Sequence, residues 1–395
     1  MTTGIYRKKI YSYRISIAVS ILWIFCFSCK AQKPIQILFE SAKGAPIVMA
    51  CSPGNIAAGD INNDGNPDLV LACGGTRSLN IFIGRGDGQF EITPGSPLLL
   101  PHPPNEIVIG DMNNDKHLDF VIGSHDTYGI IILAGDGKGK FIVSPDSVRM
   151  REGSHPHTHG LGIADLNGDN YIDIVTANSS DNDISVMLNK GSAGFIPAPG
   201  SPFPVGKSPY PLTIGDVNSD KHLDIVSTST HASSKFLTLL LGDGQGQFQR
   251  SDVPLRTINP WFVAIGDINK DQIPDIVTTH SERSELTVLL GSGNNQFTEV
   301  TGSPFNLGNS AWHVAIADFN RDNNPDVIAA ANNGVRVMLG DGKGQFVSAP
   351  GSPFLTGKGT WHLAISDVNK DGLPDIVTSN LESNNVSVLV GKKHE

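Results

Sequence analysis

Several features that mark common protein classes are missing or scarce in this chain of 395 residues. Lysine and arginine total 29 against 39 acidic residues, and they form no basic patch of the kind that binds nucleic acid. No stretch shows the pattern of an amphipathic helix. Nucleophile elbows, paired catalytic carboxylates and metalloprotease motifs are also missing. The sequence therefore does not support a nucleic-acid-binding protein or a hydrolase of a common type.

Long apolar runs are scarce too, and the one near the N-terminus is short. Residues 15–27 form an apolar run of 13 residues, whereas a helix that crosses a bilayer needs about 20. Four basic residues precede it, which is typical of a signal peptide, and we place that signal at residues 1–28. Phe27-Ser28-Cys29 also resembles a loose lipoprotein site, at which Cys29 would be lipidated; cleavage after Ala31 is the alternative. Either way we expect export, as a secreted, periplasmic or outer-membrane protein.

Cysteine is rare, with four residues in total. Cys26 and Cys29 lie in or beside the predicted signal, which leaves Cys51 and Cys73. An oxidising compartment would let these two form a disulfide, and two small buried residues are the alternative.

What the chain does contain is a nine-residue frame that is repeated seven times. Its first copy, residues 60–68, carries Asp, Asn, Asp and Asp at positions 1, 3, 5 and 9. Successive copies begin 49 to 54 residues apart, so one supersecondary unit is repeated along the chain. The later copies are residues 111–119, 165–173, 216–224, 267–275, 318–326 and 367–375.

The chemistry of this frame points to calcium, which takes about six to eight oxygen ligands. By analogy with the start of an EF-hand loop, the side chains at positions 1, 3 and 5 and the backbone carbonyl of position 7 would converge on one ion. We expect the Asp at position 9 to complete the site with both oxygens. Zinc is disfavoured, because the only histidines in the frames stand at position 7, where the backbone is the ligand. The predicted ligands are Asp60, Asn62, Asp64, Asn66, Asp68, Asp111, Asn113, Asp115, His117, Asp119, Asp165, Asn167, Asp169, Tyr171, Asp173, Asp216, Asn218, Asp220, His222, Asp224, Asp267, Asn269, Asp271, Ile273, Asp275, Asp318, Asn320, Asp322, Asn324, Asp326, Asp367, Asn369, Asp371, Leu373 and Asp375.

Asx turns between strands are the alternative interpretation of these loops, but a turn does not need three acids. Position 6 suits a residue that tolerates positive φ, which Gly does best and Asn next. We therefore expect up to seven calcium ions, with weaker binding in the second, fourth and fifth loops. The residues at position 6 are Gly65, Lys116, Asn170, Lys221, Gln272, Asn323 and Gly372.

Each repeat also contains four short strand patterns. Residues 107–110 precede an acidic loop, residues 69–71 follow one, and a third pattern such as 184–188 leads into a glycine-rich turn such as 84–90. Because these turns are followed by a strand and not by a helix, they are hairpin turns and not phosphate loops. Four-stranded repeats of about 50 residues fit the blades of a β-propeller. We expect an all-β, seven-bladed propeller over residues 34–395.

The two ends of this region indicate how the ring closes. The last repeat ends soon after its third strand, residues 386–390, and lacks a fourth. Residues 35–39 form a strand pattern before the first complete unit and have no other partner. We expect this N-terminal strand to complete the seventh blade.

The acidic loops, the strand patterns and the glycine-rich turns that end in Phe together resemble the FG-GAP/VCBS repeat family over residues 34–395. That family includes the propeller of integrin alpha chains and many exported bacterial proteins. The resemblance implies a calcium-binding propeller. It does not select an activity, since relatives serve as adhesion modules, as lectins and as supports for polysaccharide lyases.

A second register indicates a ligand site on the face opposite the acidic loops. The residue six before each frame is Gly54, Asn105, His159, Tyr210, Trp261, Trp312 and Trp361 in chain order. His313 and His362 follow two of the tryptophans. Around a propeller these side chains would ring the mouth of the central channel, where aromatic rings suit stacking on sugars. A plug that packs blade against blade is the alternative.

Residues 154–159 contain three histidines, His155, His157 and His159, at alternate positions. They could form a metal or acid–base cluster, but a solvated loop is favoured because no Asp or Glu partner is visible to orient the rings. His125, His231 and His280 are expected in loops between second and third strands and could join a site there.

Three functions remain open. The favoured one is an exported binding or adhesion module for a glycan or an extracellular protein, without catalysis, in which calcium is structural. The second is a calcium-stabilised scaffold. The third is a polysaccharide lyase or hydrolase that uses His157, His159 and Tyr210 for proton transfer. We expect contact with a membrane only through a lipid on Cys29.

Overall fold

The computed structural model describes residues 37–143, 148–153, 155–280 and 282–393. The predicted signal peptide and Cys29 lie outside this range. Within it, no helix has both the length and the apolar character needed to cross a membrane.

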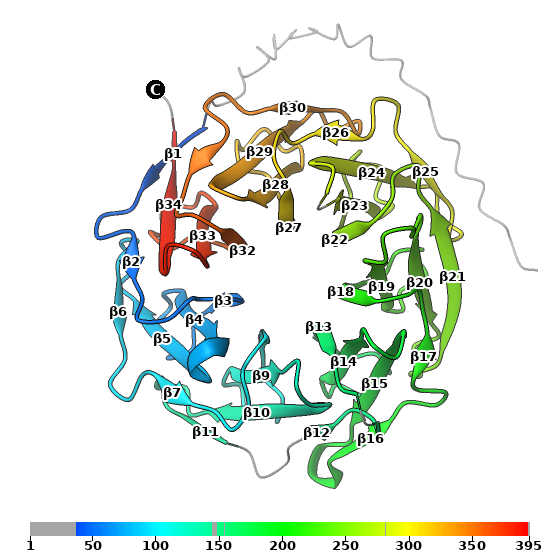
Figure 1. Cartoon of the computed structure of the whole chain (residues 1–395), viewed down its shortest axis with the longest axis horizontal. Coiled ribbons are helices and arrows are strands. Elements are labelled where there is room, and N and C mark those ends of the chain that lie inside the picture. Colours follow the sequence, from blue (N-terminus) through cyan, green and yellow to red (C-terminus); the bar gives the residue numbers. More distant parts are fainter. Residues whose placement is uncertain (1–36, 144–147, 154, 281, 394–395) are drawn as a thin grey trace, which may run out of the picture. The chain divides into compact units, whose positions relative to one another are not determined.

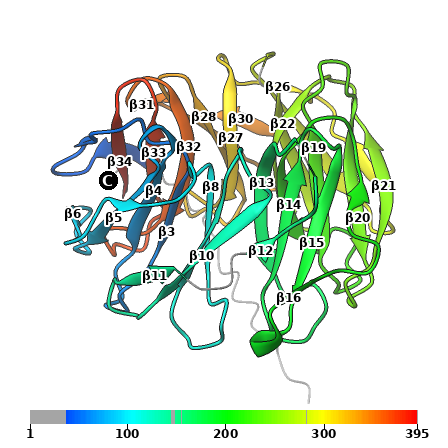
Figure 2. The ribbon, with the colours of Figure 1, turned by 60° about the horizontal axis from the view of Figure 1, so that its bottom comes forward.

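The described residues form seven antiparallel sheets, or blades, arranged radially around one axis (Figure 1). In the first six blades the chain runs from the innermost to the outermost strand, and the strands extend between the two faces of the ring (Figure 2). The predicted all-β propeller is confirmed. From inner to outer strand, the blades are β3 (Ile56–Gly59), β4 (Asp68–Cys73), β5 (Ser78–Gly84) and β6 (Phe90–Ile92); β8 (Glu106–Gly110), β9 (Asp119–Gly123), β10 (Gly129–Gly135) and β11 (Phe141–Val143); β13 (Thr158–Ala164), β14 (Asp173–Asn178), β15 (Asp183–Asn189) and β16 (Phe195–Pro197); β18 (Pro209–Gly215), β19 (Asp224–Ser229), β20 (Phe236–Gly242) and β21 (Phe248–Pro254); β22 (Pro260–Gly266), β23 (Asp275–His280), β24 (Glu285–Gly291) and β25 (Phe297–Glu299); β27 (Ala311–Ala317), β28 (Asp326–Ala331), β29 (Gly334–Gly340) and β30 (Phe346–Ser348); β32 (Thr360–Ser366), β33 (Asp375–Asn380), β34 (Asn385–Lys393) and β1 (Ile37–Ser41).

The seventh blade is completed by the N-terminal strand, as expected. β1 pairs antiparallel with β34, and Phe39 lies opposite Gly391. In the first blade the turn residue Phe90 lies opposite Gly84 in the same way. The first strand of the propeller thus supplies the phenylalanine that the last repeat lacks.

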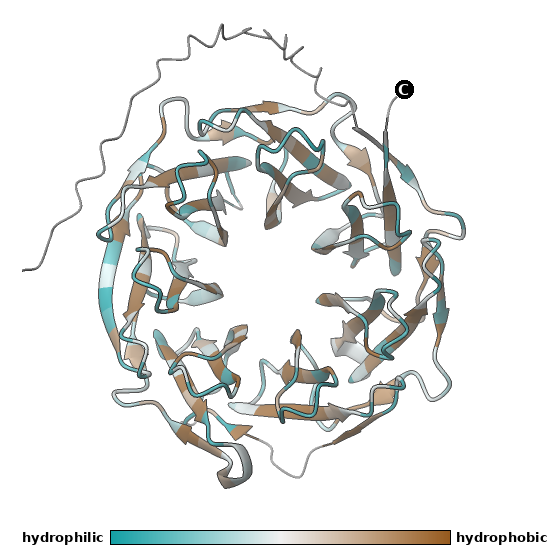
Figure 3. Cartoon of the chain, turned by 180° about the vertical axis from the view of Figure 1, so that it is seen from behind, coloured by the Kyte–Doolittle hydropathy of each residue, from teal (hydrophilic) through white to brown (hydrophobic). Residues whose placement is uncertain are grey.

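The core lies between the blades. The second strand of each blade is buried along its whole length, which explains its run of aliphatic residues. Hydrophobic clusters join consecutive blades, and one of them packs Val377 and Val388 of the last blade on Leu69 and Leu71 of the first. Each such side chain contributes about 1.5–3 kcal/mol on burial. In Figure 3 the hydrophobic colour follows these strands and the loops are hydrophilic.

The outer edge carries a feature that the strand patterns did not predict. Six blades add a two-residue strand that pairs back to the third strand. In four of them the serine of a Gly-Ser-Pro sequence accepts a third-strand N–H, as Ser96 Oγ does from Ile81 (3.0 Å). The fourth blade lacks this sequence and keeps one continuous outer strand, β21. Short outer strands limit edge-to-edge pairing between molecules. The two-residue strands are β2 (Ile47–Val48), β7 (Leu98–Leu99), β12 (Val148–Arg149), β17 (Phe203–Pro204), β26 (Phe305–Asn306) and β31 (Phe354–Leu355).

Cys51 and Cys73 form a disulfide, with a Cα–Cα distance of 6.0 Å. It joins the segment that enters β3 to the end of β4. The amide of Asn80 donates a hydrogen bond to Cys73 Sγ (3.2 Å). Of the two interpretations of these cysteines, the structure therefore has the paired one.

Candidate functional site

The seven acidic frames connect the innermost strand of each blade to the second strand. In the first loop, the Asp60 carboxylate accepts N–H bonds from Asp64 (3.0 Å) and Gly65 (2.8 Å), and Asn62 Oδ1 also accepts from Asp64 (3.0 Å). The same three bonds recur in the other six loops. The oxygens of positions 1 and 3 are thereby gathered around one backbone amide in every loop.

Position 6 adopts positive φ in all seven loops, as predicted. The angle is 81° at Gly65, and it is also positive at the lysines and the glutamine, with 70° at Lys116, 72° at Lys221 and 68° at Gln272. The loop network therefore imposes this conformation even where the side chain disfavours it. Position 4 shares it, which sequence reasoning missed. The residues there are Asn63, Asn114, Gly168, Ser219, Lys270, Arg321 and Lys370.

The Asp at position 9 is buried in every loop and anchors two parts of its blade. Asp68 Oδ2 accepts the N–H of Ile61 (3.0 Å), and Asp68 Oδ1 accepts the N–H of Gly84 at the end of the third strand (2.8 Å). Burial raises the pKa of Asp68 to about 6 and that of Asp326 to about 7, although these hydrogen bonds favour the charged form. Each oxygen keeps a further lone pair for a ligand.

This donor set fits calcium. Each loop presents oxygen ligands only, and a divalent cation would supply the counter-charge that three neighbouring carboxylates need. Across the described ranges, no group of three or more His, Cys, Asp and Glu side chains is placed to hold a metal ion. The predicted sets depend in part on Asn side chains and a backbone carbonyl, which fall outside those four residue types. Calcium therefore stays a prediction that the loop chemistry supports.

The third loop differs from the rest by one basic contact. Lys190 Nζ lies 2.8 Å from Asp169 Oδ2, at position 5 of the frame. The ammonium group occupies an oxygen that calcium would use. This contact would weaken calcium binding in the third loop, which the ranking from position 6 did not include.

Five of the residues predicted to bind ligand form a continuous arc around the propeller axis. The ring centroids of His159 and Tyr210 lie 3.9 Å apart, those of Tyr210 and Trp261 4.8 Å, those of Trp261 and Trp312 5.6 Å, and those of Trp312 and Trp361 5.3 Å. Neighbouring blades contribute successive members. Residues at the same position of successive repeats thus contact one another in the folded protein.

A second row of side chains lies beside this arc. Phe262 contacts His313 (4.5 Å between ring centroids), and His313 contacts His362 (3.9 Å). Adjacent residues of a regular strand point to opposite faces, yet Trp261 and Phe262 both contact the sixth blade, at Trp312 and His313. A bulge at the start of the inner strand, between Pro260 and Val263 in this blade, explains the change of direction.

The arc is open where the first two blades carry Gly54 and Asn105 in place of a large ring. A pocket of about 430 Å³ lies at this gap, and its lining includes Trp361, at one end of the arc, and Tyr210, which follows His159 at the other end. His125 and Asp126, from the loop between β9 and β10, also line it. None of the described residues in its wall is Lys or Arg. The wall offers aromatic surface beside hydrogen-bonding groups, and Asp126 is the one acidic residue among the described residues that line it.

Asn55, one of the residues that line this pocket, connects it to a buried polar group. Asn55 Nδ2 donates to Glu106 Oε2 (2.5 Å) and lies 3.2 Å from His362 Nε2. Burial raises the pKa of Glu106 to about 7, and burial together with the Glu106 charge raises the pKa of Tyr210. Sequence reasoning missed Asn55 and Glu106. Each lies one residue after a member of the predicted ring, Gly54 or Asn105. The sequence prediction included the residue after a ring member only at His313 and His362.

Comparison with known proteins identifies the repeat. The sequence profile described as FG-GAP-like repeat matches six overlapping segments, residues 60–122, 111–176, 165–227, 216–278, 267–329 and 318–378. The chain belongs to the FG-GAP-like repeat family. No curated protein matches the sequence.

Solved structures resemble this FG-GAP-like propeller in fold. BBS1N in complex with ARL6DN gives a TM-score of 0.58 at 14% identity, over 90% of this chain and 96% of that one. A second crystal of that complex gives 0.59 at 15%, over 89% and 96%. An Agrocybe aegerita lectin, described as recognising non-reducing terminal N-acetylglucosamine, gives 0.56 at 14%, over 89% and 96%. At these identities the likeness shows the fold alone.

The histidines divide into separate environments. His125 Nε2 lies 3.0 Å from His159 Nδ1, and His159 Nε2 lies 2.9 Å from His157 Nε2, so three imidazoles meet beside the pocket. The solvated-loop interpretation holds for the exposed His155 and His157 but is wrong for His159, which is buried because Tyr210 packs against it. Burial lowers the pKa of His159 to about 2.

The other two histidines do not join this group. His231 is exposed and bonds to Ser233 (2.9 Å). His280 ends strand β23 and is fully buried, with Nδ1 donating to Ile258 O (2.9 Å) and Nε2 bonded to Thr287 Oγ1 (2.8 Å). The expectation that His280 lies in a loop was wrong, because the second strand extends beyond its aliphatic residues Ile276 and Val277 to His280.

Proposed function

We propose that this FG-GAP-like propeller is an exported binding module that takes a glycan at the pocket between Tyr210 and Trp361. The observation that carries the proposal is the gap in the aromatic arc. Sugar rings stack on aromatic faces, and the pocket volume of about 430 Å³ falls in the range of small-ligand sites. Asn105 Nδ2 is buried without a hydrogen-bond partner, so a ligand hydroxyl there would gain a bond without breaking one.

Two further points support binding over catalysis. His159, on which an enzyme would depend, has a pKa lowered to about 2 by burial, and such a group is a poor base near neutral pH. Among solved structures of the same fold, one is a lectin and another is a propeller in complex with a protein. A protein partner at the same face is therefore the second candidate.

In this proposal calcium has a structural role. The side chains at positions 1, 3, 5 and 9 of each loop would hold the ion together with the carbonyl of position 7. The bound ion would neutralise the clustered carboxylates and stabilise the folded state by mass action. The Cys51–Cys73 disulfide supports the export that the N-terminal segment predicts, since such bonds persist in oxidising compartments.

A glycan array tests the proposal. Residues 32–395 are labelled and applied in calcium and, separately, in chelator after the fold has been checked by circular dichroism. We expect one class of sugars to be retained in calcium and lost in chelator. A folded, calcium-loaded protein that retains no glycan would contradict the glycan proposal and favour a protein partner.

A further inference from the structure

The pocket at the gap in the aromatic arc, which we call the glycan pocket, carries charged groups of one sign. Asp126 lies in its wall and is exposed to solvent. A second carboxylate, that of Glu106, lies behind the wall, where it accepts a hydrogen bond from the lining residue Asn55 (2.5 Å). Burial and the Glu106 charge together raise the pKa of Tyr210, so this carboxylate acts on a second lining residue. No Lys or Arg is found among the described residues of the wall.

Glu106 receives little compensation from the protein for its burial. Burial raises its pKa to about 7, and among the described residues the Asn55 hydrogen bond is the one contact that acts in the opposite direction. The Asn55 side chain is itself committed, since Nδ2 also lies 3.2 Å from His362 Nε2 and Oδ1 accepts the N–H of Ile107 (3.3 Å). It holds Oε2 of Glu106 and leaves Oε1 for another donor. A cation that bound there would stabilise the ionised carboxylate.

The histidines near the pocket do not supply that cation at neutral pH. Burial and the neighbouring His157 lower the pKa of His125, which lines the pocket. Burial lowers the pKa of His362 to about 4. Both imidazoles are therefore neutral, and the charge at the pocket comes from the two carboxylates. A ligand that carries a carboxylate of its own, such as a uronic acid, would be repelled.

The aromatic part of the wall suits the same ligand charge. A positive group over the face of an indole or phenol ring is attracted by the quadrupole of the ring, most strongly at tryptophan. Trp361 and Tyr210 supply such rings to the pocket. The apolar face of a sugar stacks on the same surfaces, so a sugar with an ammonium group combines both contacts. A neutral sugar makes only the stacking contact and leaves the Glu106 charge uncompensated.

We propose that the glycan pocket selects amino sugars, and that Asp126 and Glu106 recognise their free ammonium group. This inference rests on the proposed glycan site and adds the charge of the ligand. The unpartnered Asn105 Nδ2 remains for a hydroxyl oxygen of the same sugar. N-acetylation replaces the ammonium by a bulkier uncharged amide, so it removes the group that the two carboxylates bind. The acetylated form should therefore bind more weakly than the free amino sugar.

Ligand-observed NMR tests the proposal with matched sugars at neutral pH, in saturating calcium so that amines do not collect at the acidic loops. The probes are glucosamine, galactosamine and mannosamine, each compared with its N-acetylated form and with the hexose that lacks nitrogen. We expect one amino sugar to bind at least about fivefold more tightly than both of its counterparts. Added salt should weaken that binding, because it screens charges. Trp361→Ala should weaken it too, which places the sugar in the glycan pocket.

Two charge-removing variants assign the selectivity to the carboxylates. Glu106→Gln keeps an oxygen that can accept from Asn55 and should weaken binding of the amino sugar by about tenfold. Asp126→Asn changes an exposed group and should weaken it by about threefold. Glu282→Gln is the matched control and should bind like the wild type. Glu282 is an exposed acid in the corresponding loop of the fifth blade, between β23 and β24, and is not among the described residues that line the pocket.

The selectivity proposal is overturned if the N-acetylated sugars or the hexoses bind as tightly as the amino sugars, and the glycan site itself then stands. It is also overturned if Glu282→Gln weakens binding as much as the two pocket variants, or if no amino sugar binds saturably. The glycan site fails by a separate result, when no sugar of any kind is retained on the array. Because Asp126 is exposed, Asp126→Asn keeps the test decisive even where Glu106→Gln lowers the melting temperature.

Discussion

Replacing Phe39 by alanine should destabilise the propeller by about 2–3 kcal/mol. Phe39 lies opposite Gly391, and it is the side chain through which the N-terminal strand closes the ring. Its ring lies 5.0 Å from the ring of Phe354 and 5.9 Å from that of Phe319, both in edge-to-face geometry. All three side chains pack in or against one hydrophobic cluster between the sixth and seventh blades.

The magnitude follows from burial and from these two ring contacts. A fully buried Phe→Ala change costs about 3–5 kcal/mol. Phe39 is only partly buried, so the lower part of that range applies, and each edge-to-face pair contributes about 0.5–1.5 kcal/mol of the loss. Phe39→Leu keeps the aliphatic contacts and should lose about half as much.

The assay is urea unfolding in saturating calcium, followed by the fluorescence of the tryptophans in the aromatic arc. Glu40→Ala is the matched control, because the neighbouring side chain is exposed and makes only a surface ion pair with Lys392. That change should cost less than about 1 kcal/mol. Equal losses in Phe39→Ala and Glu40→Ala would refute the closing role of this strand.

Three further predictions concern the acidic loops and a buried histidine. Asp64→Ala should lower the melting temperature in calcium and have little effect in chelator, because the bound ion stabilises only the folded state; equal shifts in both buffers would argue against an ion in that loop. Replacing Lys190 by methionine should strengthen terbium binding to the third loop, because the ammonium no longer competes for Asp169. Terbium luminescence sensitised by Tyr171 reports on that loop, and Tyr171→Phe gives the background signal. An unchanged terbium titration would contradict the inference. Burial lowers the pKa of His280 from 6.5 to about 4, so its contribution to stability is complete above pH 6.5 and is lost as the pH falls toward 4. Between these pH values the wild type should lose up to about 3 kcal/mol more stability than His280→Asn, measured by urea unfolding, and parallel losses would contradict this assignment.

The sequence predicted the features that repeat. Seven acidic frames at a nearly constant spacing led to seven blades, because each unit must bury its strands against its neighbours. The unpaired pattern at residues 35–39 led to ring closure. The register of Trp261, Trp312 and Trp361 led to a contiguous aromatic arc, since equivalent positions of a propeller converge on its axis.

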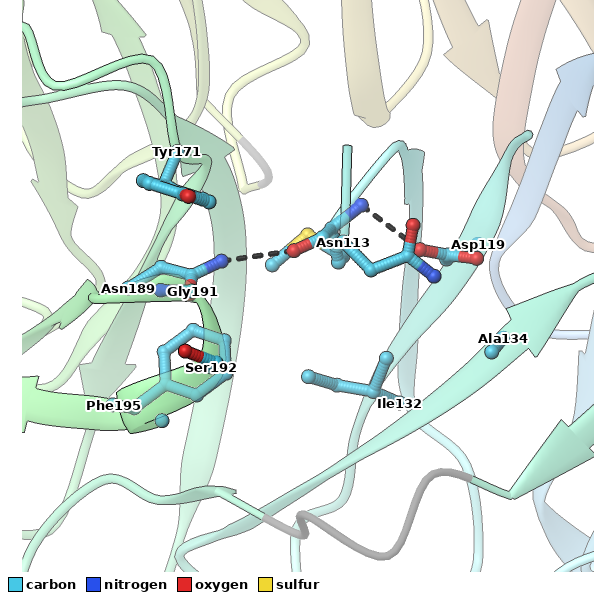
Figure 4. Close-up of a pocket in the computed structure, with 11 residues that line it drawn as sticks. Asn113, Asp119, Ile132, Ala134, Tyr171, Asn189, Gly191, Ser192 and Phe195 are labelled. Atoms are coloured by element: carbon cyan, nitrogen blue, oxygen red, sulfur yellow. Dashed lines mark hydrogen bonds between the residues drawn. The ribbon is translucent and has the colours of Figure 1, made fainter. Parts of the chain in front are cut away.

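Features that depend on a break in the repeat were harder to predict. Glu106 lies next to the predicted register on the regularly paired strand β8. It joins the site by accepting a hydrogen bond from Asn55 of the first blade, a contact between blades that strand periodicity does not reveal. His125 meets His159 only because the loop after β9 in the second blade reaches strand β13 of the third. A pocket of about 410 Å³ between the second and third blades is lined by Ala134 and by an irregular turn more than 50 residues away (Figure 4), and each feature alone looks unremarkable in the sequence.

The central claim is that the gap in the aromatic arc binds a glycan, and a calorimetric titration tests it most directly. The sugar selected on the array is titrated into the wild type, Trp361→Ala and Trp312→Ala in saturating calcium. Both variants remove an indole from the arc, but only Trp361 lines the pocket. We predict that Trp361→Ala weakens binding by at least about tenfold, or 1.4 kcal/mol, while Trp312→Ala has a much smaller effect. Equal affinities for all three proteins, with unchanged melting temperatures, would show that the arc is packing and that the ligand binds elsewhere.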